Sequence, residues 1–477
     1  MPARFGIADS AVMSTAPPIP EELWNQLPPA AQAAVLAVIA TLEARIAELE
    51  ARLNQNSSNS SKPPSSDPPH AKPAPPRPTG QRRKGGQPGH PKNNRPALPP
   101  DQVVELRADT CTRCHTALAG DDPRPLVHQV VEIPPIRPHV TEYRRHRRTC
   151  PRCRRVTCAP LPSDVRGGYG VRLQAACALL SGAYRIGKRG VARLCAELFG
   201  VPISPAAVCD LQHRTTDALA PAHAELRAHA VGQPANVDET GWHQHGKRHW
   251  LWAAVTGAAS VFVVHPSRGR KALAELVGAT PGVLTTDRYP VYDHLGGTAR
   301  QVCWAHLRRD FQGLIDRGGA GRLIGEGLLE CADRLLLNWK RVRDGTRFRG
   351  EFSREHLCVV QRRVEALLDQ GRGCGCPAAR RLCRELDRVY ESLWTFATSA
   401  GVEPTNNAVE RALRGAVCWR KTSYGTDSAQ GSRFVGRILS AVETCRQHGR
   451  NLLTFLAHTI QAHRNNTPTP TLIPSAV

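Results

Sequence analysis

The sequence predicts a multidomain α+β protein, and three features of the chain lead to that prediction. The chain has 477 residues, which is too long for one ordinary hydrophobic core, and length alone suggests about three domains. Its first third combines a helical heptad pattern, a Pro- and Ser-rich stretch and two pairs of cysteines. Between residues 234 and 305, strand-like runs surround one helix-like run, an order typical of a mixed α/β sheet.

The first predicted element is a helix over residues 21–54. Its apolar side chains recur at alternating spacings of four and three residues, at Val35, Ile39, Leu42, Ile46, Leu49 and Leu53. This is the seam of a coiled coil, with charged residues around it, and it indicates self-association. An amphipathic helix docked on its own domain is the alternative.

Residues 55–100 are rich in Asn, Ser, Pro and basic residues, and such a composition cannot bury a core. We expect a disordered basic linker here. It contains the basic arm of Arg82, Arg83 and Lys84, a kind of segment that often lies along DNA phosphates. A merely solvated linker is the alternative for its Pro-rich half.

Residues 101–160 contain two Cys-x-x-Cys knuckles, formed by Cys111, Cys114, Cys150 and Cys153. Two thiols at this spacing can chelate one tetrahedral Zn²⁺, and two such pairs close a Cys₄ structural site. Between the knuckles, Val127, Val131 and Ile133 would share one face of a strand, so we expect a zinc ribbon. Four unrelated thiols are the alternative, and His115 and Cys158 are possible substitute ligands.

Residues 165–230 have a helical pattern that could form a DNA-binding region. Within it, residues 190–205 suggest a helix, a glycine turn and a second helix capped by Ser204, with Pro205 at its first position. This arrangement is typical of a helix-turn-helix, whose second helix could enter a major groove. Two packed helices without a DNA role are the alternative.

Three acidic residues stand in settings that suggest a catalytic site. Asp238 precedes the strand-like run 249–255, Asp287 ends the apolar run 282–287, and Glu410 lies in the helix-like run 408–414. Carboxylates delivered by two strands and one helix are what a two-metal phosphoryl-transfer site needs, because oxygen ligands hold Mg²⁺. Asp238 fits a strand only if residues 235–240 form one.

The elements around these acids predict one catalytic core in two segments, 231–305 and 401–465. In the first segment we expect a hairpin over 249–256 and 260–265, a helix over 270–277, and strands ending at Asp287 and Trp304. Residues 306–400 are predicted to be a helical insertion. The second segment should contain the Glu410 helix and a helix over 434–448, followed by a frayed tail after Asn465.

Each acid also has a simpler interpretation. Asp238 and Asp287 could be turn residues beside strands. If Asn407 is the helix N-cap, Glu410 occupies the N3 position of a capping box, and Arg414 could pair with it one turn on. His306 could be structural, or it could contact the attacked phosphate or a nearby acid.

Charge and cysteine usage narrow the class of protein. The formal net charge is +23 and the pI about 9.9, which favours a polyanionic partner, although an Arg-biased solvated surface is the alternative. No export signal is visible in residues 1–20, and no run of about 18 apolar residues is present. We therefore expect no membrane span, mostly reduced thiols among the 16 Cys, and a cytoplasmic, nucleoid-associated protein.

These motifs together resemble transposases of the insertion sequence sixty-six family, which carry an acidic DDE triad. The resemblance spans most of the chain. Besides the zipper, linker and knuckles, it rests on Gly-Gly-Gln-Pro-Gly-His at 85–90, Asp-Glu-Thr at 238–240, Asp287, Cys-Trp-Ala-His-Leu-Arg-Arg at 303–309, Asn-Asn-Ala-Val-Glu-Arg at 406–411 and the stretch 420–445. It implies an RNase H-like domain with the first acid on the first strand, the second at the end of the fourth and the third on a later helix.

The resulting hypothesis is a DNA transposase in which Asp238, Asp287 and Glu410 hold two Mg²⁺ (or Mn²⁺) ions and one structural Zn²⁺ stabilises the ribbon. Its partners would be double-stranded DNA at element ends and target, a second copy of the chain, and possible helper proteins. The expected DNA contacts are Arg82, Arg83, Lys84, Arg308, Arg309, Arg411, Arg414, Arg420 and Lys421. The alternatives are a dimeric zinc-containing DNA-binding regulator without catalysis and an RNase H-like structure-selective nuclease.

Overall fold

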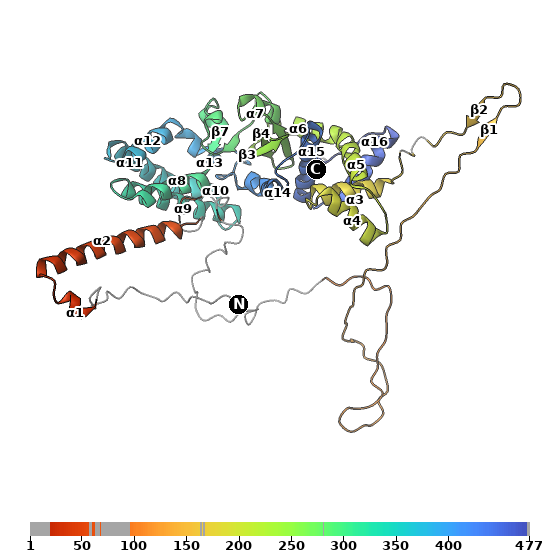
Figure 1. Ribbon diagram of the computed structural model, residues 1–477, viewed down its shortest axis with the longest axis horizontal. Coiled ribbons are helices and arrows are strands. Elements are labelled where there is room, and N and C mark those ends of the chain that lie inside the picture. Colours follow the sequence, from red (N-terminus) through yellow and green to blue (C-terminus); the bar gives the residue numbers. More distant parts are fainter. Residues whose placement is uncertain are drawn as a thin grey trace. The chain divides into compact units, whose positions relative to one another are not determined.

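The computed structural model describes residues 20–56, 60–62, 67, 96–162, 165, 167–279 and 281–474 (Figure 1). They divide into two compact units. The first contains the described part of residues 1–75 together with 308–331 and 363–381, and the second contains the rest. The predicted insertion over 306–400 therefore contributes to both units. The basic arm of Arg82, Arg83 and Lys84 lies outside the described residues.

The first unit begins with two helices, α1 (Glu21–Trp24) and α2 (Pro29–Leu53). The prediction of one helix from residue 21 is wrong at its start, because Pro28 and Pro29 cannot continue a preceding helix, although proline is well suited to begin one. Four of the six heptad side chains of α2 are exposed, Leu42 (56%), Ile46 (55%), Leu49 (44%) and Leu53 (83%), whereas Val35 and Ile39 are half-buried. Docking of this seam on the protein's own domain is therefore not seen in the described residues, and the coiled coil stays a prediction.

By length and composition alone, one helix in the described part of the chain is apolar enough to cross a membrane. It is the Pro29–Ala51 part of α2, with a mean hydropathy of 1.5. A signal sequence or a core helix of a soluble protein meets the same criterion, so this helix is weak evidence for a span.

The rest of the first unit is helical. It comprises the second half of α8 (Trp304–Arg317), the first half of α9 (Gly321–Arg343), most of α11 (Cys358–Gly373) and the start of α12 (Pro377–Arg388). Leu314, Leu328 and Leu367 are buried in it. The predicted helical character of this part of the chain is confirmed.

The second unit begins with the cysteine knuckles. Their only regular strands, among the described residues, are β1 (Arg147–Thr149) and β2 (Val156–Cys158), which pair antiparallel around the second knuckle. The predicted strand containing Val127, Val131 and Ile133 is wrong, since the structure has no strand there and these side chains are 51–81% exposed. Alternating apolar residues form a strand only where a second surface covers their apolar face.

Four helices follow, α3 (Val171–Gly182), α4 (Lys188–Phe199), α5 (Pro205–Ala218) and α6 (Ala220–Ala230). Gly200 ends α4 in a left-handed conformation, and the Ser204 side chain caps α5 by accepting a hydrogen bond from Ala207 N at 3.1 Å. The predicted helix, turn and capped helix are thus present. The exposed face of α5 carries Asp210, Arg214 and Asp217, with Asp210 paired to Arg214 at 2.9 Å, and the role of α5 as a groove-reading helix stays a prediction.

The centre of the second unit is a five-stranded sheet with the order β5-β4-β3-β6-β7. Its strands are β3 (Ala235–Gln244), β4 (Lys247–Val255), β5 (Ser260–His265), β6 (Leu284–Thr286) and β7 (Arg300–Val302). The first three are antiparallel neighbours, whereas β6 and β7 run parallel to β3. The predicted hairpin and the crossover helix, α7 (Arg270–Val277), are confirmed.

Two C-terminal helices pack against this sheet, α14 (Asn407–Ser423) against β3 and β4, and α15 (Ala429–Gln447) against β5. Helix α15 also satisfies the outer edge of β5, because Ser440 Oγ accepts a hydrogen bond from Phe262 N (2.9 Å) and Thr444 Oγ1 accepts one from Ser260 N (3.1 Å). A sheet edge covered in this way cannot pair with another strand.

The C-terminal region differs from the prediction in three respects. Helix α15 begins at Ala429 instead of residue 434, and a further helix, α16 (Leu452–Asn465), follows it. The expected fraying after Asn465 is wrong as far as residue 474, since Leu472 is fully buried and Thr471 Oγ1 donates to Glu225 Oε1 at 2.5 Å. The apolar Leu472 anchors this segment to the core.

The remaining short elements belong to the second unit. They are η2 (Pro290–Tyr292), η3 (Gly297–Ala299), α10 (Arg349–Glu351), the π-helix η4 (Phe352–Leu357), η5 (Glu391–Leu393) and α13 (Thr395–Thr398). Strand β7 contacts η3, η5 and α13. These contacts fix the end of the sheet at which Asp287 lies.

Candidate active site

Asp238 and Asp287 lie on neighbouring parallel strands. Asp238 is in the middle of β3, paired with Ala253 of β4, so its interpretation as a turn residue is wrong. Asp287 follows the last residue of β6. The register pairs Ala235 with Leu284 and Asn236 with Thr285, and its continuation by two places sets Asp238 beside Asp287.

Glu410 lies near the start of α14, and its charge acts on Asp238. The N-cap of this helix is Asn406, one residue before the predicted cap, which places Glu410 at N4. Asn406 N donates to Cys303 Sγ at 3.3 Å, so the backbone group that a capping-box glutamate would bind is already used. The capping-box hypothesis is therefore wrong. Near the other end of α14, Arg420 Nη1 donates to Thr240 Oγ1 at 3.0 Å, which shows that the helix covers the sheet face shared by Thr240 and Asp238.

The charges of the three acids act on one another. The pKa of Asp238 is raised well above its ordinary value, first by burial, then by the charges of Glu239 and Asp287, and to a smaller extent by Glu410. Such a concentration of negative charge disfavours ionisation unless a cation compensates it. The donor set, three carboxylates, fits a hard divalent cation such as Mg²⁺.

His306 stands next to Glu410, with Nε2 3.5 Å from Glu410 Oε1. It occupies the first turn of α8, directly after β7 and Cys303. Of the roles left open for this residue, contact with a nearby acid is the one seen. Because His306 is tied to the fold through α8, it helps to fix the direction of the Glu410 carboxylate.

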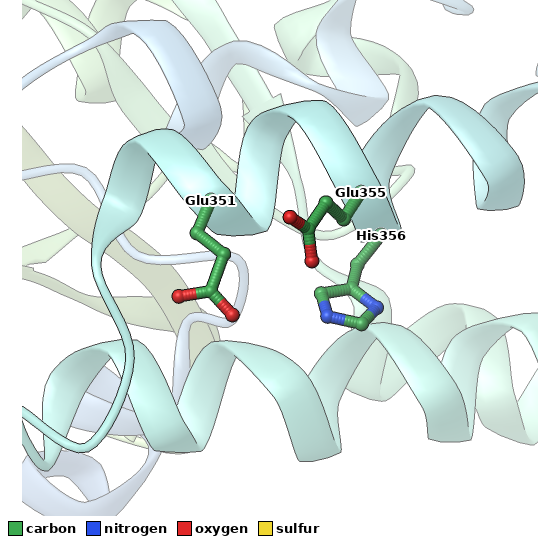
Figure 2. Close-up of side chains that lie close together, drawn as sticks. All are labelled: Glu351, Glu355 and His356. Carbon is green, nitrogen blue, oxygen red and sulfur yellow. The ribbon is translucent and has the colours of Figure 1, made fainter.

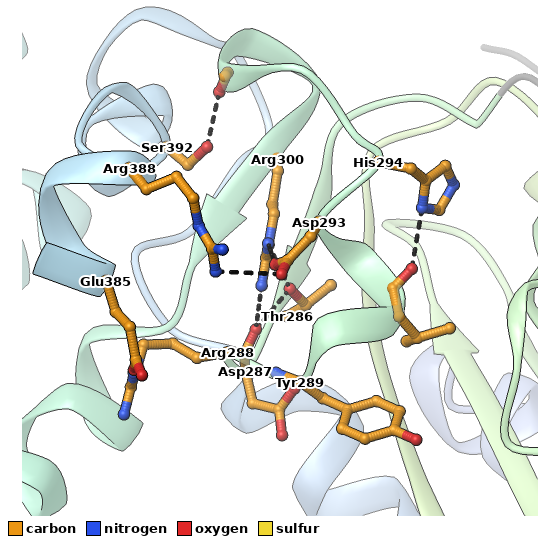
Figure 3. A network of polar contacts seen from close by, with 12 residues as sticks. Thr286, Asp287, Arg288, Tyr289, Asp293, His294, Arg300, Glu385, Arg388 and Ser392 are labelled. Carbon is orange, nitrogen blue, oxygen red and sulfur yellow. Dashed lines mark hydrogen bonds and ion pairs between the residues drawn. The ribbon is translucent and has the colours of Figure 1, made fainter. Parts of the chain in front are cut away.

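Arg300 is a site residue that the sequence did not suggest. It lies on β7, is 1% exposed, and points at the segment that carries Asp287 (Figure 3). Its guanidinium donates to Thr286 Oγ1 (3.1 Å), to the backbone oxygen of Asp287 (2.8 Å) and to Asp293 Oδ1 (3.0 Å). Arg300 therefore holds the backbone at Asp287, and nothing in a three-residue strand containing one arginine signals that the arginine is buried.

A second buried network lies on the other face of β3. The Glu239 side chain is 1% exposed, its Oε1 is 2.6 Å from Arg268 Nε, and its Oε2 accepts a hydrogen bond from the Tyr292 hydroxyl at 3.0 Å. Burial and the charge of Glu239 raise the pKa of Tyr292 well above its usual range, so the hydroxyl stays protonated and donates. The Arg268 guanidinium in turn lies over the rings of Trp250 and Tyr289. Adjacent residues of one strand thus have different partners, Asp238 the other acids and Glu239 an arginine and a tyrosine.

The tightest metal-ligand group in the described part of the chain lies elsewhere. Only Glu351, Glu355 and His356 form a set of three with all ligand atoms within 4.8 Å of one another (Figure 2). Arg347 lies against this set, with Nε 3.4 Å from Glu351 Oε1 and Nη1 in contact with His356 Nε2. A guanidinium already compensates the charge there, so we assign no metal to it. Asp238, Asp287 and Glu410, which all belong to the described residues, do not form such a set.

Comparison with known protein families agrees with this geometry. A family model described as "Transposase IS66 family" matches residues 166–433, which is more than half of the chain. The chain belongs to this family. The matched residues include Asp238, Asp287 and Glu410. The resemblance inferred from the sequence is thus confirmed at the level of the family.

Two further matches precede the transposase region. A model described as "zinc-finger binding domain of transposase IS66" matches residues 108–154, and a family of unknown function (DUF6444) matches residues 17–96. The chain is also similar to two uncharacterized proteins of Sinorhizobium fredii (strain NBRC 101917 / NGR234). It is 24% identical to y4qI, over 44% of this chain and 43% of y4qI. It is 25% identical to y4hP, over 75% of this chain and 71% of y4hP. The chain therefore spans less than half the length of the first of these relatives.

The region that matches the zinc-finger model contains two knuckles of the same geometry. In the first, Cys111 N donates to Thr116 O and His115 N to Cys111 O, both at 2.9 Å; in the second, Cys150 N donates to Arg155 O and Arg154 N to Cys150 O, also at 2.9 Å. His115 and Arg154 occupy equivalent left-handed positions, with φ of 57° and 59°.

The knuckles favour thiolates, which are the form that binds zinc. A hydrogen bond with Thr116 lowers the pKa of Cys114 to about 7, and backbone N–H groups of Cys153 and Arg152 lower the pKa of Cys150. The two pairs do not lie within ligand distance of each other in the structure, so their joining into one Cys₄ site stays a prediction.

The predicted DNA-contacting residues occupy different parts of the chain. Arg420 is half-buried between α14 and β3, while Arg411, Arg414 and Lys421 are exposed on α14. Arg308 is exposed on α8, and Arg308 and Arg309 belong to the first unit. Contact of these residues with DNA stays a prediction.

We expect Arg300→Met to destabilise the second unit by about 3–5 kcal/mol, because it leaves Asp293 and the backbone oxygen of Asp287 without their buried cationic donor. The matched control is Arg388→Met, which removes a second arginine from the same Asp293 (3.2 Å) but from an exposed side chain, at a cost of about 1 kcal/mol or less. Urea denaturation followed by tryptophan fluorescence measures both. Equal effects of the two substitutions would show that burial of Arg300 is not what stabilises this segment.

Proposed function

We propose that this protein is a metal-dependent DDE transposase with an RNase H-like catalytic domain, which binds the ends of an insertion sequence and cleaves and transfers DNA strands. The observation that carries the proposal is the placement of the three acids. Asp238 is on the first strand of the sheet, Asp287 follows the fourth, and Glu410 is on a later helix that covers the face of Asp238.

In this proposal, Asp238, Asp287 and Glu410 hold two Mg²⁺ or Mn²⁺ ions. When bound, such ions activate the attacking oxygen and stabilise the leaving oxygen of an in-line phosphoryl transfer. The protein supplies the positions of the ligands. Arg300 fixes the backbone of Asp287, His306 orients Glu410, and the strand register sets Asp238 beside Asp287.

The zinc-binding domain and the strong positive charge support DNA as the partner. A regulator without catalysis would also carry these features, but it would not need Asp238, Asp287 and Glu410 in this order of strands and helix. A nuclease on the same fold would need them and would stop after cleavage. Joining of the cleaved end to a second DNA is therefore the step that separates the proposal from both alternatives.

The test uses purified full-length protein and labelled DNA that carries the terminal repeats flanking the gene. With Mg²⁺ we expect cleavage at the repeat ends and joined products with a second DNA, and with EDTA neither. Cleavage without joining would favour the nuclease, and binding without cleavage in either Mg²⁺ or Mn²⁺ would favour the regulator.

We expect deletion of residues 1–54 to weaken self-association and paired-end complexes while sparing metal-dependent chemistry on a pre-nicked substrate. The reason is that the seam of α2 exposes Leu42, Ile46 and Leu53, which a second α2 would cover. Analytical ultracentrifugation of both proteins, with and without DNA, measures the change. If both sediment as the same oligomer, the self-association site lies elsewhere in the chain.

A further inference from the structure

A large cavity adjoins the catalytic face of the sheet within the second unit. Its volume is about 1010 Å³, enough for more than one nucleotide. It is open on one side and is lined by the end of α3, the start of α4, the middle of α5, the turn between β3 and β4, the end of α14, residues 424–428 and the start of α15. No role proposed above uses this space.

One wall of the cavity is rigidly joined to β3. Thr426 N donates to His243 O at 2.9 Å, and His245 N donates to Thr426 O at 2.8 Å, so residues 424–428 extend the sheet by one short bridge. Gly425 has φ of 117°, and a Cβ there would collide with the carbonyl oxygen of His243. Only a residue without a side chain lets residues 424–428 come this close to His243. The resulting backbone hydrogen bonds hold the side chains next to Gly425 in place.

Two aromatic side chains line this wall. Tyr424 ends α14 in a left-handed conformation, with φ of 59°, and is 82% exposed. Helices usually place glycine in this conformation, because other residues are strained in it. Trp419, one turn earlier, is held edge-on by Trp242 and Phe434, each with ring centroids 6.4 Å away. A strained, exposed tyrosine on a rigid support offers its ring to a ligand.

The opposite wall offers hydrogen bonds and positive charge. Gln212 of α5 lines the cavity and is 8% exposed, and within the described part of the chain its side-chain amide has no hydrogen-bond partner. Lys188 is the first residue of α4, whose N-cap, Gly187, supplies no side-chain cap. The N–H groups of that helix end and Lys188 together favour an anion. The one carboxylate in the lining, Asp427, lies 3.1 Å from His245 Nδ1.

We infer that this cavity binds an unpaired nucleotide at the end of the DNA strand on which the acids act. Aromatic rings stack on any base, an amide can pair with a base edge, and cationic groups hold the phosphates. Arg420 links the cavity to the acids, since it lines the cavity and donates to Thr240 Oγ1, two residues from Asp238 on the same sheet face. The inference rests on the proposed DNA substrate and adds that part of it is single-stranded.

The test measures binding in EDTA, so that it does not depend on cleavage. Full-length protein is titrated into a terminal-repeat duplex that is either blunt or carries a short unpaired tail containing 2-aminopurine. We expect wild-type protein to prefer the tailed duplex by about tenfold and to quench the 2-aminopurine through stacking. Tyr424→Ala and Gln212→Leu should lose the preference while keeping the affinity for the blunt duplex.

Phe348→Ala is the matched control, because Phe348 is equally exposed (84%) but does not line the cavity, and it should behave as wild type. The inference is overturned if the tail brings no preference, or if Tyr424→Ala retains both preference and quenching. If the wild type then cleaves DNA in Mg²⁺, the proposed function survives that result. The opposite result is also possible: the wild type prefers the tailed duplex, Tyr424→Ala does not, and no DNA is cleaved. This result would support nucleotide binding in the cavity and contradict the proposed transposase chemistry. Displacement of the tail by free deoxynucleotide would show that the cavity recognises the nucleotide unit itself.

Discussion

Asp238→Asn, Asp287→Asn and Glu410→Gln are each expected to abolish DNA strand cleavage and to leave DNA binding largely intact. Each substitution removes the charge of one proposed metal ligand and keeps the shape of the side chain. Replacement of groups that only support metal ligands already costs about 10–100-fold, so loss of a ligand should exceed that. Gel analysis of labelled terminal-repeat DNA measures cleavage, and anisotropy in EDTA measures binding.

Thermal unfolding separates a catalytic from a structural role for Asp238. Its pKa is raised in the folded protein, so folding disfavours its charged form. The resulting loss of stability begins as the pH rises above its unfolded pKa of about 3.9 and is complete once the pH passes the folded pKa. Without metal near neutral pH, Asp238→Asn should therefore melt at a higher temperature than wild type.

Mg²⁺ provides the complementary arm of this experiment. Mg²⁺ should raise the melting temperature of the wild type, because an ion that binds only the folded state stabilises that state. The increase should be smaller in each of the three variants. A variant that retains near-normal cleavage does not belong to the triad. For Glu410, retention of cleavage would leave the contact with His306 as its role.

The second large effect concerns zinc. Purified protein should contain about one Zn²⁺ per chain, and Cys111→Ser should lower this content and unfold the knuckle domain. Metal binding free energies of about 10–16 kcal/mol in zinc-finger peptides are also folding free energies, so loss of one thiolate affects both. Elemental analysis measures the metal, and limited proteolysis of residues 101–160 measures the folding.

Cys158→Ser is the matched control for zinc. Cys158 lies on β2, five residues after Cys153, but outside the repeated knuckle geometry, and its thiol points at Arg145 O at 3.9 Å. Its substitution should leave the zinc content unchanged. Unchanged zinc in Cys111→Ser would refute the assignment, and loss in Cys158→Ser alone would make Cys158 the ligand.

The sequence predicted those parts of the site whose signals are local. The strand before Asp287 was predicted from the apolar run that precedes this residue, although β6 ends one residue earlier, at Thr286. The hairpin of β4 and β5 was predicted from two such runs around Gly257. The position of Glu410 was predicted only to within one residue. The helix begins after Asn406, and it is the bond from Asn406 to Cys303 of a distant segment that decides this.

The parts that were missed depend on partners distant in the chain. Arg300 looks like a solvent-facing residue until Thr286, Asp287 and Asp293 surround it. Leu472 stands in a Pro- and Thr-rich tail and is ordered only because the core has room for it. Conversely, the alternation of apolar and polar residues around Val131 predicted a strand. No strand forms there, because no second surface in the described part of the chain covers these apolar side chains. Composition and periodicity contain none of this information.

The order of the three acids along the chain has a consequence during protein synthesis. The ribosome completes both aspartate strands well before it reaches Glu410, which follows the helices α8 to α13. A nascent or prematurely terminated chain that ends within those helices carries the zinc-binding domain and two of the three acids, yet its sheet lacks the cover of α14 and α15. Such a product could still occupy DNA through its N-terminal part, but it would be unable to cut. If the proposed function holds, strand cleavage therefore first becomes possible after translation has passed residue 447, where α15 ends.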